Sequence, residues 1–231
     1  MSSLSFKPSL NLLEDRCVPA AFTFSQGILT INMAEISNRT VSVTANGGNL
    51  RIQGRETGGP TNTVVGAPGG RLNLFAVTGI VVNGSGQRDI IRLAGVDTQF
   101  NNLSGRVSIF GGGGNDIIEG TQFNDRIEAG ADNDNVKGNG GDDTIFGDGG
   151  NDDLWGDGNS SFWDRNGGND TINGGSGDDK MWGRGGNDTF IGGSGSDTYD
   201  GGVGNDTAII DSQDRVPQRG WLSVGIEFTR R

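Results

Sequence analysis

Aspartate recurs at every ninth position through the second half of the sequence, and this spacing marks the residues most able to do chemistry. Cut from Gly111, residues 111–209 form eleven consecutive nonapeptides, and the sixth place is Asp in ten of them. The ten residues are Asp116, Asp125, Asp134, Asp143, Asp152, Asp170, Asp179, Asp188, Asp197 and Asp206. A row of carboxylates in glycine-rich turns attracts cations, because glycine lets backbone carbonyls converge on a common point.

The other fixed places of the nonapeptide show how the carboxylates are positioned. The eighth place is apolar or aromatic in all eleven units, whereas the first is Gly in nine and the fourth is Gly in eight. One apolar residue between two polar neighbours predicts a short strand with one side chain facing inward. The rest of the unit must turn the chain, and Gly at the first and fourth places suits a tight turn with positive φ.

Charge and composition exclude several classes of function. The net charge is −11, and residues 111–209 carry 20 acidic against 5 basic residues. Such a segment repels phosphate, so neither nucleic acid nor an anionic membrane surface is expected as a partner. The chain has no apolar run long enough for a transmembrane helix. It also has no His, which excludes the Ser-His-Asp triad and the zinc-protease helix, and its one Cys excludes an internal disulfide.

The units resemble the RTX, or haemolysin-type, calcium-binding repeat with the pattern G-G-x-G-x-D-x-U-x, in phase through residues 111–209. The resemblance implies an all-β fold, a right-handed parallel β-roll with two nonapeptides per turn, that binds several Ca²⁺ ions between loops of successive turns through the ten aspartates. Residues two units apart are then stacked neighbours. One edge is expected to carry Asp116, Asp134, Asp152, Asp170, Asp188 and Asp206, and the other Asp125, Asp143, Asp179 and Asp197.

This arrangement explains why a flexible chain is also strongly negative. Stacked strands lie about 4.8 Å apart, and two carboxylates at that spacing repel by about 3 kcal/mol at an effective dielectric of about 20. Ca²⁺ accepts six to eight oxygen ligands, so an ion between two turns converts this repulsion into a bridge. Because glycine-rich chain loses much entropy on ordering, we expect the repeat to fold on binding calcium.

The unit GDGNSSFWD has Ser161 where the other units have Asp. Its length keeps the period and Trp163 occupies the eighth place, so the sequence predicts an uninterrupted roll that lacks one calcium site, on the edge of Asp143 and Asp179. Trp155 and Trp182 are three units apart, and this odd spacing predicts that they lie on opposite sheets.

Four segments are predicted. Residues 1–20 form an N-terminal tail whose stretch LNLLEDRCVPA resembles a short signature of exported or surface proteins of bacteria. Residues 21–110 alternate short β-type runs with Gly and Pro, which predicts a strand-rich solenoid or capping region. Within it, Asp89 lies three units before Asp116, and the two degenerate units after it place Phe100 and Ile109 inward. Residues 111–209 form the calcium-binding roll, and residues 210–231 a C-terminal cap.

The sequence therefore favours a structural or adhesive module, secreted or on the cell surface, that binds calcium and is not an enzyme. The partner of such a module is expected to be a cell-surface polysaccharide or protein. The alternative is a secreted enzyme acting on polysaccharides through two carboxylates in residues 21–110, with the roll as a folding aid. Catalytic carboxylates need different environments, and a periodic ladder gives all its acids nearly the same one. An unbroken apolar ladder inside residues 21–110 would favour the module, and a carboxylate pair on one face would favour the enzyme.

Overall fold

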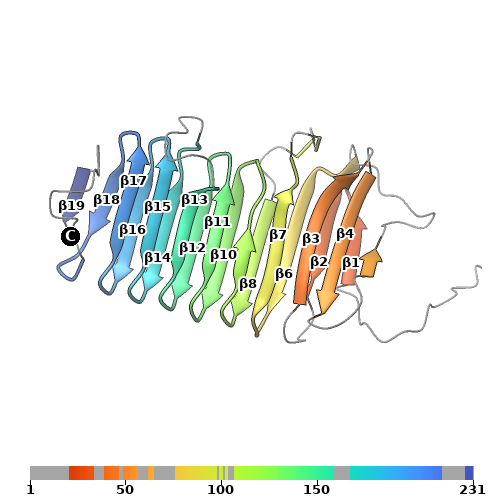
Figure 1. The fold of residues 1–231 in the computed structure, drawn as a ribbon, viewed down its shortest axis with the longest axis horizontal. Helices are drawn as coiled ribbons and strands as arrows, with labels where there is room; N and C mark the ends of the chain where they lie inside the picture. The colour runs from red at the N-terminus through yellow and green to blue at the C-terminus, as the bar shows by residue number, and fades with distance from the viewer. Residues whose placement is uncertain are drawn as a thin grey trace, which may run out of the picture.

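The computed structural model describes residues 21–33, 39–46, 49–56, 62–64, 76–97, 99–100, 102–103, 107–158, 167–214 and 227–230. These residues form nineteen β-strands and no α-helix. The strands lie in two sheets that face each other along the length of the molecule, and from β5 to β18 the chain alternates between the sheets (Figure 1). The all-β parallel roll expected from the sequence is confirmed. None of the described segments is a helix able to span a bilayer.

The ten-stranded sheet has the order β1-β2-β6-β8-β10-β12-β14-β16-β18-β19. Its strands are β1 (Ala21–Ser25), β2 (Ile28–Asn32), β6 (Gly79–Ser85), β8 (Val107–Gly113), β10 (Asp125–Ala131), β12 (Thr144–Gly149), β14 (Thr171–Ser176), β16 (Thr189–Ser194), β18 (Thr207–Ile210) and β19 (Glu227–Arg230). All neighbours are parallel except the hairpin of β1 and β2.

The nine-stranded sheet has the order β17-β15-β13-β11-β9-β7-β3-β4-β5. Its strands are β3 (Arg39–Asn46), β4 (Asn49–Glu56), β5 (Asn62–Val64), β7 (Asp89–Gly95), β9 (Ile117–Glu119), β11 (Asn135–Asn139), β13 (Asp153–Asp157), β15 (Lys180–Gly185) and β17 (Thr198–Val203). The antiparallel strands β3, β4 and β5 end this sheet on the N-terminal side, whereas β3 pairs with β7 in parallel.

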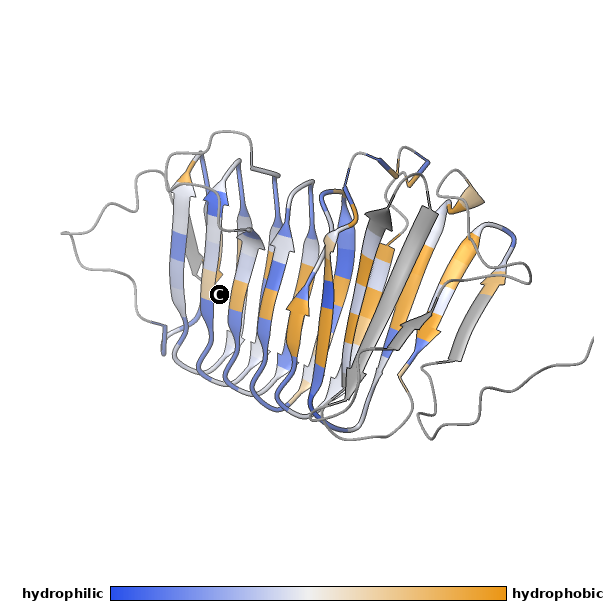
Figure 2. Ribbon diagram, turned by 45° about the vertical axis from the view of Figure 1, so that its right-hand side comes forward, coloured by the Kyte–Doolittle hydropathy of each residue, from blue (hydrophilic) through white to orange (hydrophobic). Residues whose placement is uncertain are grey.

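The core lies between the sheets, and each unit of the repeat contributes one apolar side chain to it. Ile118, Ile127, Val136, Ile145 and Leu154 occupy eighth places and are completely buried. Their neighbours at the seventh and ninth places are only partly buried or exposed, as the alternation of a pleated strand requires. Figure 2 shows the result as a short hydrophobic band on each repeat strand, with hydrophilic turns.

The N-terminal half continues the same interior with more apolar side chains for each strand. In β6, Ile80 and Val82 both point inward and are fully buried, and β7 contributes Ile91 and Leu93 in the same way. Phe100 is also buried, as its phase in the repeat predicts, although it lies outside any strand. The roll therefore begins on a support that is more hydrophobic than the repeat itself.

The register departs from the sequence-based expectation at the unit GDGNSSFWD. Strand β12 pairs with β14 with Thr144 opposite Thr171, a step of three units, although the steps on either side of it in this sheet span two. Strand β13 pairs with β15 by the same longer step. The prediction of an uninterrupted two-unit stacking is therefore wrong, and Trp163 lies outside the described residues.

The physical reason is that this unit lacks both residues that close a turn. Its fourth place is Asn159 and its sixth is Ser161, so it has neither the usual Gly nor the carboxylate. The turn is instead closed by Gly156, at the first place of this unit, and Asp170 of the next one: a Cβ on Gly156 would collide with the Asp170 Oδ2. The extra chain equals one unit, and it exchanges the edges for every later aspartate.

The same shift corrects the prediction for the tryptophans. Trp155 and Trp182 lie opposite each other on the adjacent strands β13 and β15, not on opposite sheets. Their rings are stacked, with centroids 4.5 Å apart and an angle of 6° between the planes. The ammonium of Lys137, on β11, lies 5.7 Å from the centre of the Trp155 ring.

Candidate metal centre

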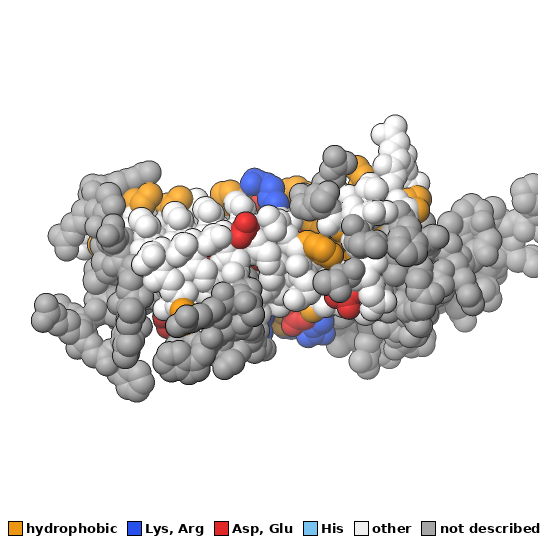
Figure 3. Space-filling view, turned by 90° about the horizontal axis from the view of Figure 1, so that it is seen from above, with side chains coloured by type: hydrophobic (Ala, Val, Ile, Leu, Met, Phe, Trp, Pro, Cys, Tyr) orange, Lys and Arg blue, Asp and Glu red, His pale blue; other side chains and the backbone are white. Residues whose placement is uncertain are grey.

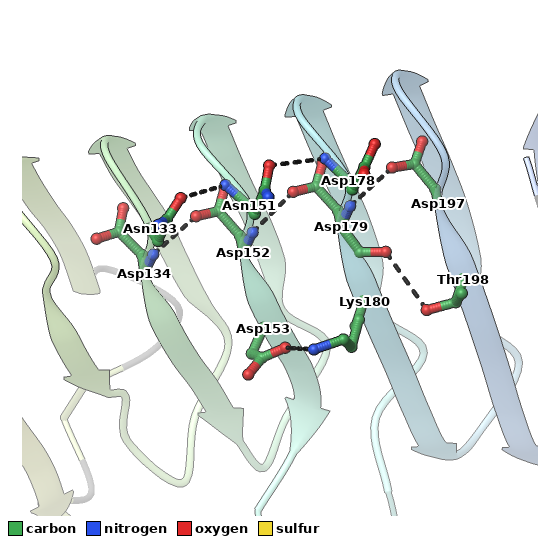
Figure 4. A network of polar contacts seen from close by, with 10 residues as sticks. All are labelled: Asn133, Asp134, Asn151, Asp152, Asp153, Asp178, Asp179, Lys180, Asp197 and Thr198. Carbon is green, nitrogen blue, oxygen red and sulfur yellow. Dashed lines mark hydrogen bonds and ion pairs between the residues drawn. The ribbon is translucent and has the colours of Figure 1, made fainter. Parts of the chain in front are cut away.

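The sixth-place aspartates form two hydrogen-bonded ladders, one along each edge of the roll. The N–H of Asp134 donates to the Asp152 Oδ1 of the next turn at 2.8 Å, and that of Asp152 to the Asp179 Oδ1 at 2.8 Å (Figure 4). The first edge carries Asp89, Asp116, Asp134, Asp152, Asp179 and Asp197. The second edge carries Asp125, Asp143, Asp170, Asp188 and Asp206. The predicted edges are therefore correct as far as Asp152 and exchanged after it, and neither ladder is broken.

All ten predicted aspartates are buried, with exposed fractions of at most 4%. Seen from above, the described surface shows few acidic side chains (Figure 3), and the sixth-place aspartates lie inside the turns. Burying an ionised carboxylate without a partner is strongly unfavourable, so such groups in proteins are paired, hydrogen-bonded or bound to a metal. The ladders account for one oxygen of nine of these groups, since Asp125 begins the second ladder and only donates within it.

The second oxygen of nine of these aspartates is buried and has no hydrogen-bond partner. The nine atoms are the Oδ2 of Asp116, Asp134, Asp143, Asp152, Asp170, Asp179, Asp188, Asp197 and Asp206. A buried acceptor left unsatisfied costs about 1–3 kcal/mol, and more when it is charged. Nine orphaned oxygens at equivalent positions therefore point to a ligand that recurs with the repeat.

First-place glycines leave the space beside eight of the nine orphaned oxygens, and the unit of Asp134 has Ala129 at this place. A Cβ on Gly147 would collide with the Asp152 Oδ2 and would lie 2.5 Å from the carbonyl oxygen of Gly174, in the next turn. A Cβ on Gly174 would collide with the Asp179 Oδ2 in the same way. In these turns a carboxylate oxygen and a backbone carbonyl of the next turn thus approach a common point beside the Gly.

Positive φ occurs at the second and fourth places of the unit, not at the first. Gly150, at a fourth place, has φ of 134°, and Asp148, at the second place of the same unit, has φ of 70°. The expectation that first-place Gly is needed for positive φ is wrong, because its role is to allow close approach. The second place was not recognised, since it holds Asn, Asp or Arg as well as Gly.

Burial raises the pKa of the ladder carboxyls well above the ordinary value for Asp. It raises the pKa of Asp134 to about 8, with smaller contributions from the neighbouring carboxylates of Asp116 and Asp152. Burial, together with the carboxylates of Asp125 and Asp170, raises the pKa of Asp143 to about 10. Without a counter-charge these groups resist ionisation at neutral pH, and a divalent cation would supply that charge.

Fifth-place side chains form a further ladder that the sequence analysis missed. The N–H of Asn151 donates to the Asn133 Oδ1 at 2.6 Å, and that of Asp178 to the Asn151 Oδ1 at 2.9 Å (Figure 4). These bonds run from each turn to the preceding one, opposite in direction to those of the aspartates. The fifth place is Asn or Asp in nine of the eleven units, so the signal was visible in the sequence.

Asp214 ends the first ladder, which was also not foreseen. Its Oδ1 accepts the N–H of Asp197 at 3.2 Å, and its Oδ2 accepts the hydroxyl of Tyr199 at 2.9 Å. It follows the last nonapeptide and lies outside the pattern, so the repeat alone could not identify it. Asp214 closes the last turn of the first edge with side-chain hydrogen bonds.

The donor set fits calcium. Within the described residues, no three His, Cys, Asp or Glu side chains converge on one point, so a site here combines Asp oxygens with backbone carbonyls. Oxygen-only coordination by carboxylates and carbonyls is the preference of Ca²⁺, whereas zinc sites use nitrogen and sulfur. The orphaned Oδ2 atoms and the carbonyls beside them would hold the ion, and the ion would supply the missing charge.

Comparison with protein families agrees with this geometry. The family described as "RTX calcium-binding nonapeptide repeat (4 copies)" matches residues 103–127, 110–144, 128–160, 165–199 and 182–208. The segment from 103 to 208 consists of RTX calcium-binding repeats. The RTX matches leave residues 161–164 uncovered, and this gap falls within the step where the register changes. No curated protein and no solved structure matches the chain.

Proposed function

We propose that this chain is an exported structural or adhesive module whose RTX segment folds around calcium ions outside the cell. The observation that carries the proposal is the set of nine orphaned, buried Asp oxygens that recur along both edges of the roll. Calcium would bind at the Oδ2 of these residues, and successive ions would join one turn of the roll to the next. Affinities of about 10⁻⁴ to 10⁻³ M are typical of extracellular calcium modules.

Export is supported by the resemblance of LNLLEDRCVPA, at residues 10–20, to a signature of exported proteins, and by the calcium requirement itself. A chain that is unfolded where calcium is scarce and folds where it is abundant can cross a membrane before it becomes rigid. The partner outside the cell would be a surface polysaccharide or a protein.

The described part of residues 21–110 supports a module rather than a polysaccharide enzyme. Its interior is an unbroken apolar ladder that includes Leu29, Ile80 and Ile91. Asp89 is buried at the start of the first-edge ladder, and Asp97 lies in a surface turn where it accepts the N–H of Gln99. These two acids do not form a pair on one face.

Calcium binding is tested by comparing Asp152→Asn with Asp153→Asn by isothermal titration and ion counting. Both variants lose one negative charge at adjacent residues. Asp152 is buried with an orphaned Oδ2, whereas Asp153 is partly exposed and pairs with the ammonium of Lys180 at 3.2 Å. We expect D152N to bind fewer calcium ions than wild type and D153N to bind the same number. Equal ion counts in all three proteins would refute the assignment of the ladder as the metal centre.

The adhesive role is tested separately, by binding of the calcium-loaded chain to immobilised polysaccharides and to bacterial surface fractions. We expect retention in millimolar calcium that is lost in EGTA. If the folded protein binds none of these surfaces, the adhesive part of the proposal fails and the calcium-binding part is unaffected.

A further inference from the structure

Asp125 differs from the other predicted ligands because both of its oxygens accept hydrogen bonds from one residue. The Thr121 N–H donates to the Asp125 Oδ2 at 2.5 Å, and the Thr121 hydroxyl donates to the Oδ1 at 2.8 Å. The same hydroxyl oxygen accepts the N–H of Phe123 at 3.0 Å. Thr121 is fully buried, so these bonds are shielded from water. This turn is closed by hydrogen bonds at the place where the other turns leave an oxygen unpaired.

Thr121 occupies the second place of its nonapeptide, and this place differs systematically between the two kinds of turn. For eight of the nine orphaned Oδ2 atoms, the second-place residue of the turn has positive φ. These residues are Gly112, Gly130, Asn139, Asp148, Gly175, Arg184, Gly193 and Gly202. The ninth atom belongs to Asp170, whose turn contains the extra unit and has Asp157 at the second place. Thr121 does not have positive φ, as expected for a β-branched side chain.

A second turn, upstream of the RTX match, independently repeats the backbone part of this arrangement, although the Ser85 hydroxyl donates to the Gln87 carbonyl oxygen and not to a carboxylate. In residues 84–92 the second place is Ser85, and its N–H donates to the Asp89 Oδ2 at 2.8 Å. The N–H of Gln87 donates to the Ser85 hydroxyl oxygen at 3.2 Å, as Phe123 does to Thr121. Ser85 also lacks positive φ. A hydroxyl residue with ordinary φ at the second place therefore coincides twice with a carboxylate that accepts the second-place N–H.

We propose that the second-place residue decides whether a turn of this roll binds calcium, and that Thr121 keeps the Asp125 turn free of metal by satisfying its carboxylate. The inference rests on the proposed function, since it presupposes that the turns with an orphaned oxygen bind calcium. The Asp125 turn has the same oxygen donors for a calcium ion as the other turns. The carbonyl oxygen of Gly138 and the Asp125 Oδ2 both lie beside the Cα of Gly120. Thr121 thus acts as a specificity-determining residue, and Asp125 is not a calcium ligand.

The two turns with a hydroxyl residue at the second place lie at the beginnings of the two ladders. Asp89 starts the first edge and Asp125 the second, and each donates its backbone N–H to the next aspartate of its ladder. The second edge therefore starts from a turn whose carboxylate is satisfied by Thr121. The N–H of Asp125 donates to the Asp143 Oδ1 at 2.8 Å, so the closed turn positions the first carboxylate on its edge that would bind an ion.

The test counts the calcium ions bound by the full-length chain, by native mass spectrometry and equilibrium dialysis. Thr121→Gly is expected to bind one ion more than wild type, because Gly adopts positive φ and removes the hydroxyl. Thr121→Ser, which keeps the closing hydrogen bonds, is expected to bind the wild-type number. Asp125→Asn is expected to remove the additional ion from T121G and to leave the count of the wild-type background unchanged.

Each outcome decides the proposal. A T121G protein with a wild-type β spectrum and a wild-type ion count would overturn it while calcium binding stands. Loss of one ion in D125N alone would also overturn it, and this variant serves if T121G does not fold. A wild-type chain that binds no calcium would refute the proposed function and with it this inference.

Discussion

Replacing Asp143 by Asn is expected to stabilise the roll without calcium and to weaken it with calcium. The Asp143 Oδ1 accepts the N–H of Asp125, and an amide oxygen can accept the same bond. Its Oδ2 is buried without a partner, beside the carbonyl of Gly156. An amide nitrogen in that place carries no charge and can donate to a carbonyl, but it cannot bind a cation.

The size of the stabilisation expected for D143N without calcium follows from the pKa of Asp143. The pKa of Asp143 is raised from 3.8 to about 10, first by burial and then by the charges of Asp125 and Asp170. A raised Asp pKa in the folded state gives stability that is fully present below about pH 4 and is lost as the pH rises towards the folded value. At pH 8 the carboxyl is about four pH units above its unfolded pKa, yet it remains protonated in the folded state. This reduces the free energy of unfolding by about 6 kcal/mol, which is on the order of the whole stability of a domain.

The assay is thermal and urea unfolding followed by circular dichroism at pH 5 and pH 8, in EGTA and in millimolar calcium. In EGTA, wild type should be more stable at pH 5 than at pH 8, and D143N should reduce this difference. In calcium at pH 8, D143N should be less stable than wild type. Asp142→Asn is the matched control, because Asp142 lies at a fifth place, where Asn occurs in most units. A D143N protein destabilised in EGTA as strongly as in calcium would refute the reasoning.

Three further changes test other parts of the roll. Gly147→Ala places a methyl group against the Asp152 Oδ2 and the Gly174 carbonyl oxygen, so it should weaken calcium binding at this turn and destabilise the loaded protein by about 1–3 kcal/mol, as measured by calcium titration and urea unfolding. The stacked rings of Trp155 and Trp182 should give an exciton couplet in the circular dichroism spectrum, lost in either Trp→Phe variant; its absence in the folded wild type would contradict the shifted register. Asp214→Ala removes acceptors of Asp197 and Tyr199 and should increase hydrogen exchange in β17 before other strands, whereas uniform exchange would contradict an end cap.

The sequence predicts the unit of this fold well, because each nonapeptide contains its own turn and its own inward residue. Burial of Ile118 and Ile127 at eighth places follows from the pattern alone, whereas burial of Asp116 and Asp134 at sixth places is known only from the structure. A feature that every unit repeats is hard to misread, since a single exception does not change the phase.

The register between turns could not be predicted in the same way. The extra chain between β13 and β14 equals one unit, so the period continues through it and Asp170 remains in sequence phase although it changes edge. The closure of Asp125 by Thr121 depends on the φ angle of one residue. Asp214 reaches the ladder from outside the repeat. In each case a local departure from periodicity determines the contact.

The most direct test of calcium-coupled folding is far-UV circular dichroism during a calcium titration of the EGTA-treated protein at pH 8, with magnesium as the control. The orphaned aspartate oxygens predict a cooperative gain of β signal at micromolar to millimolar calcium that magnesium does not produce. A β spectrum already complete in EGTA at pH 8, and unchanged by calcium, would contradict the claim that the ion holds the turns of this roll together.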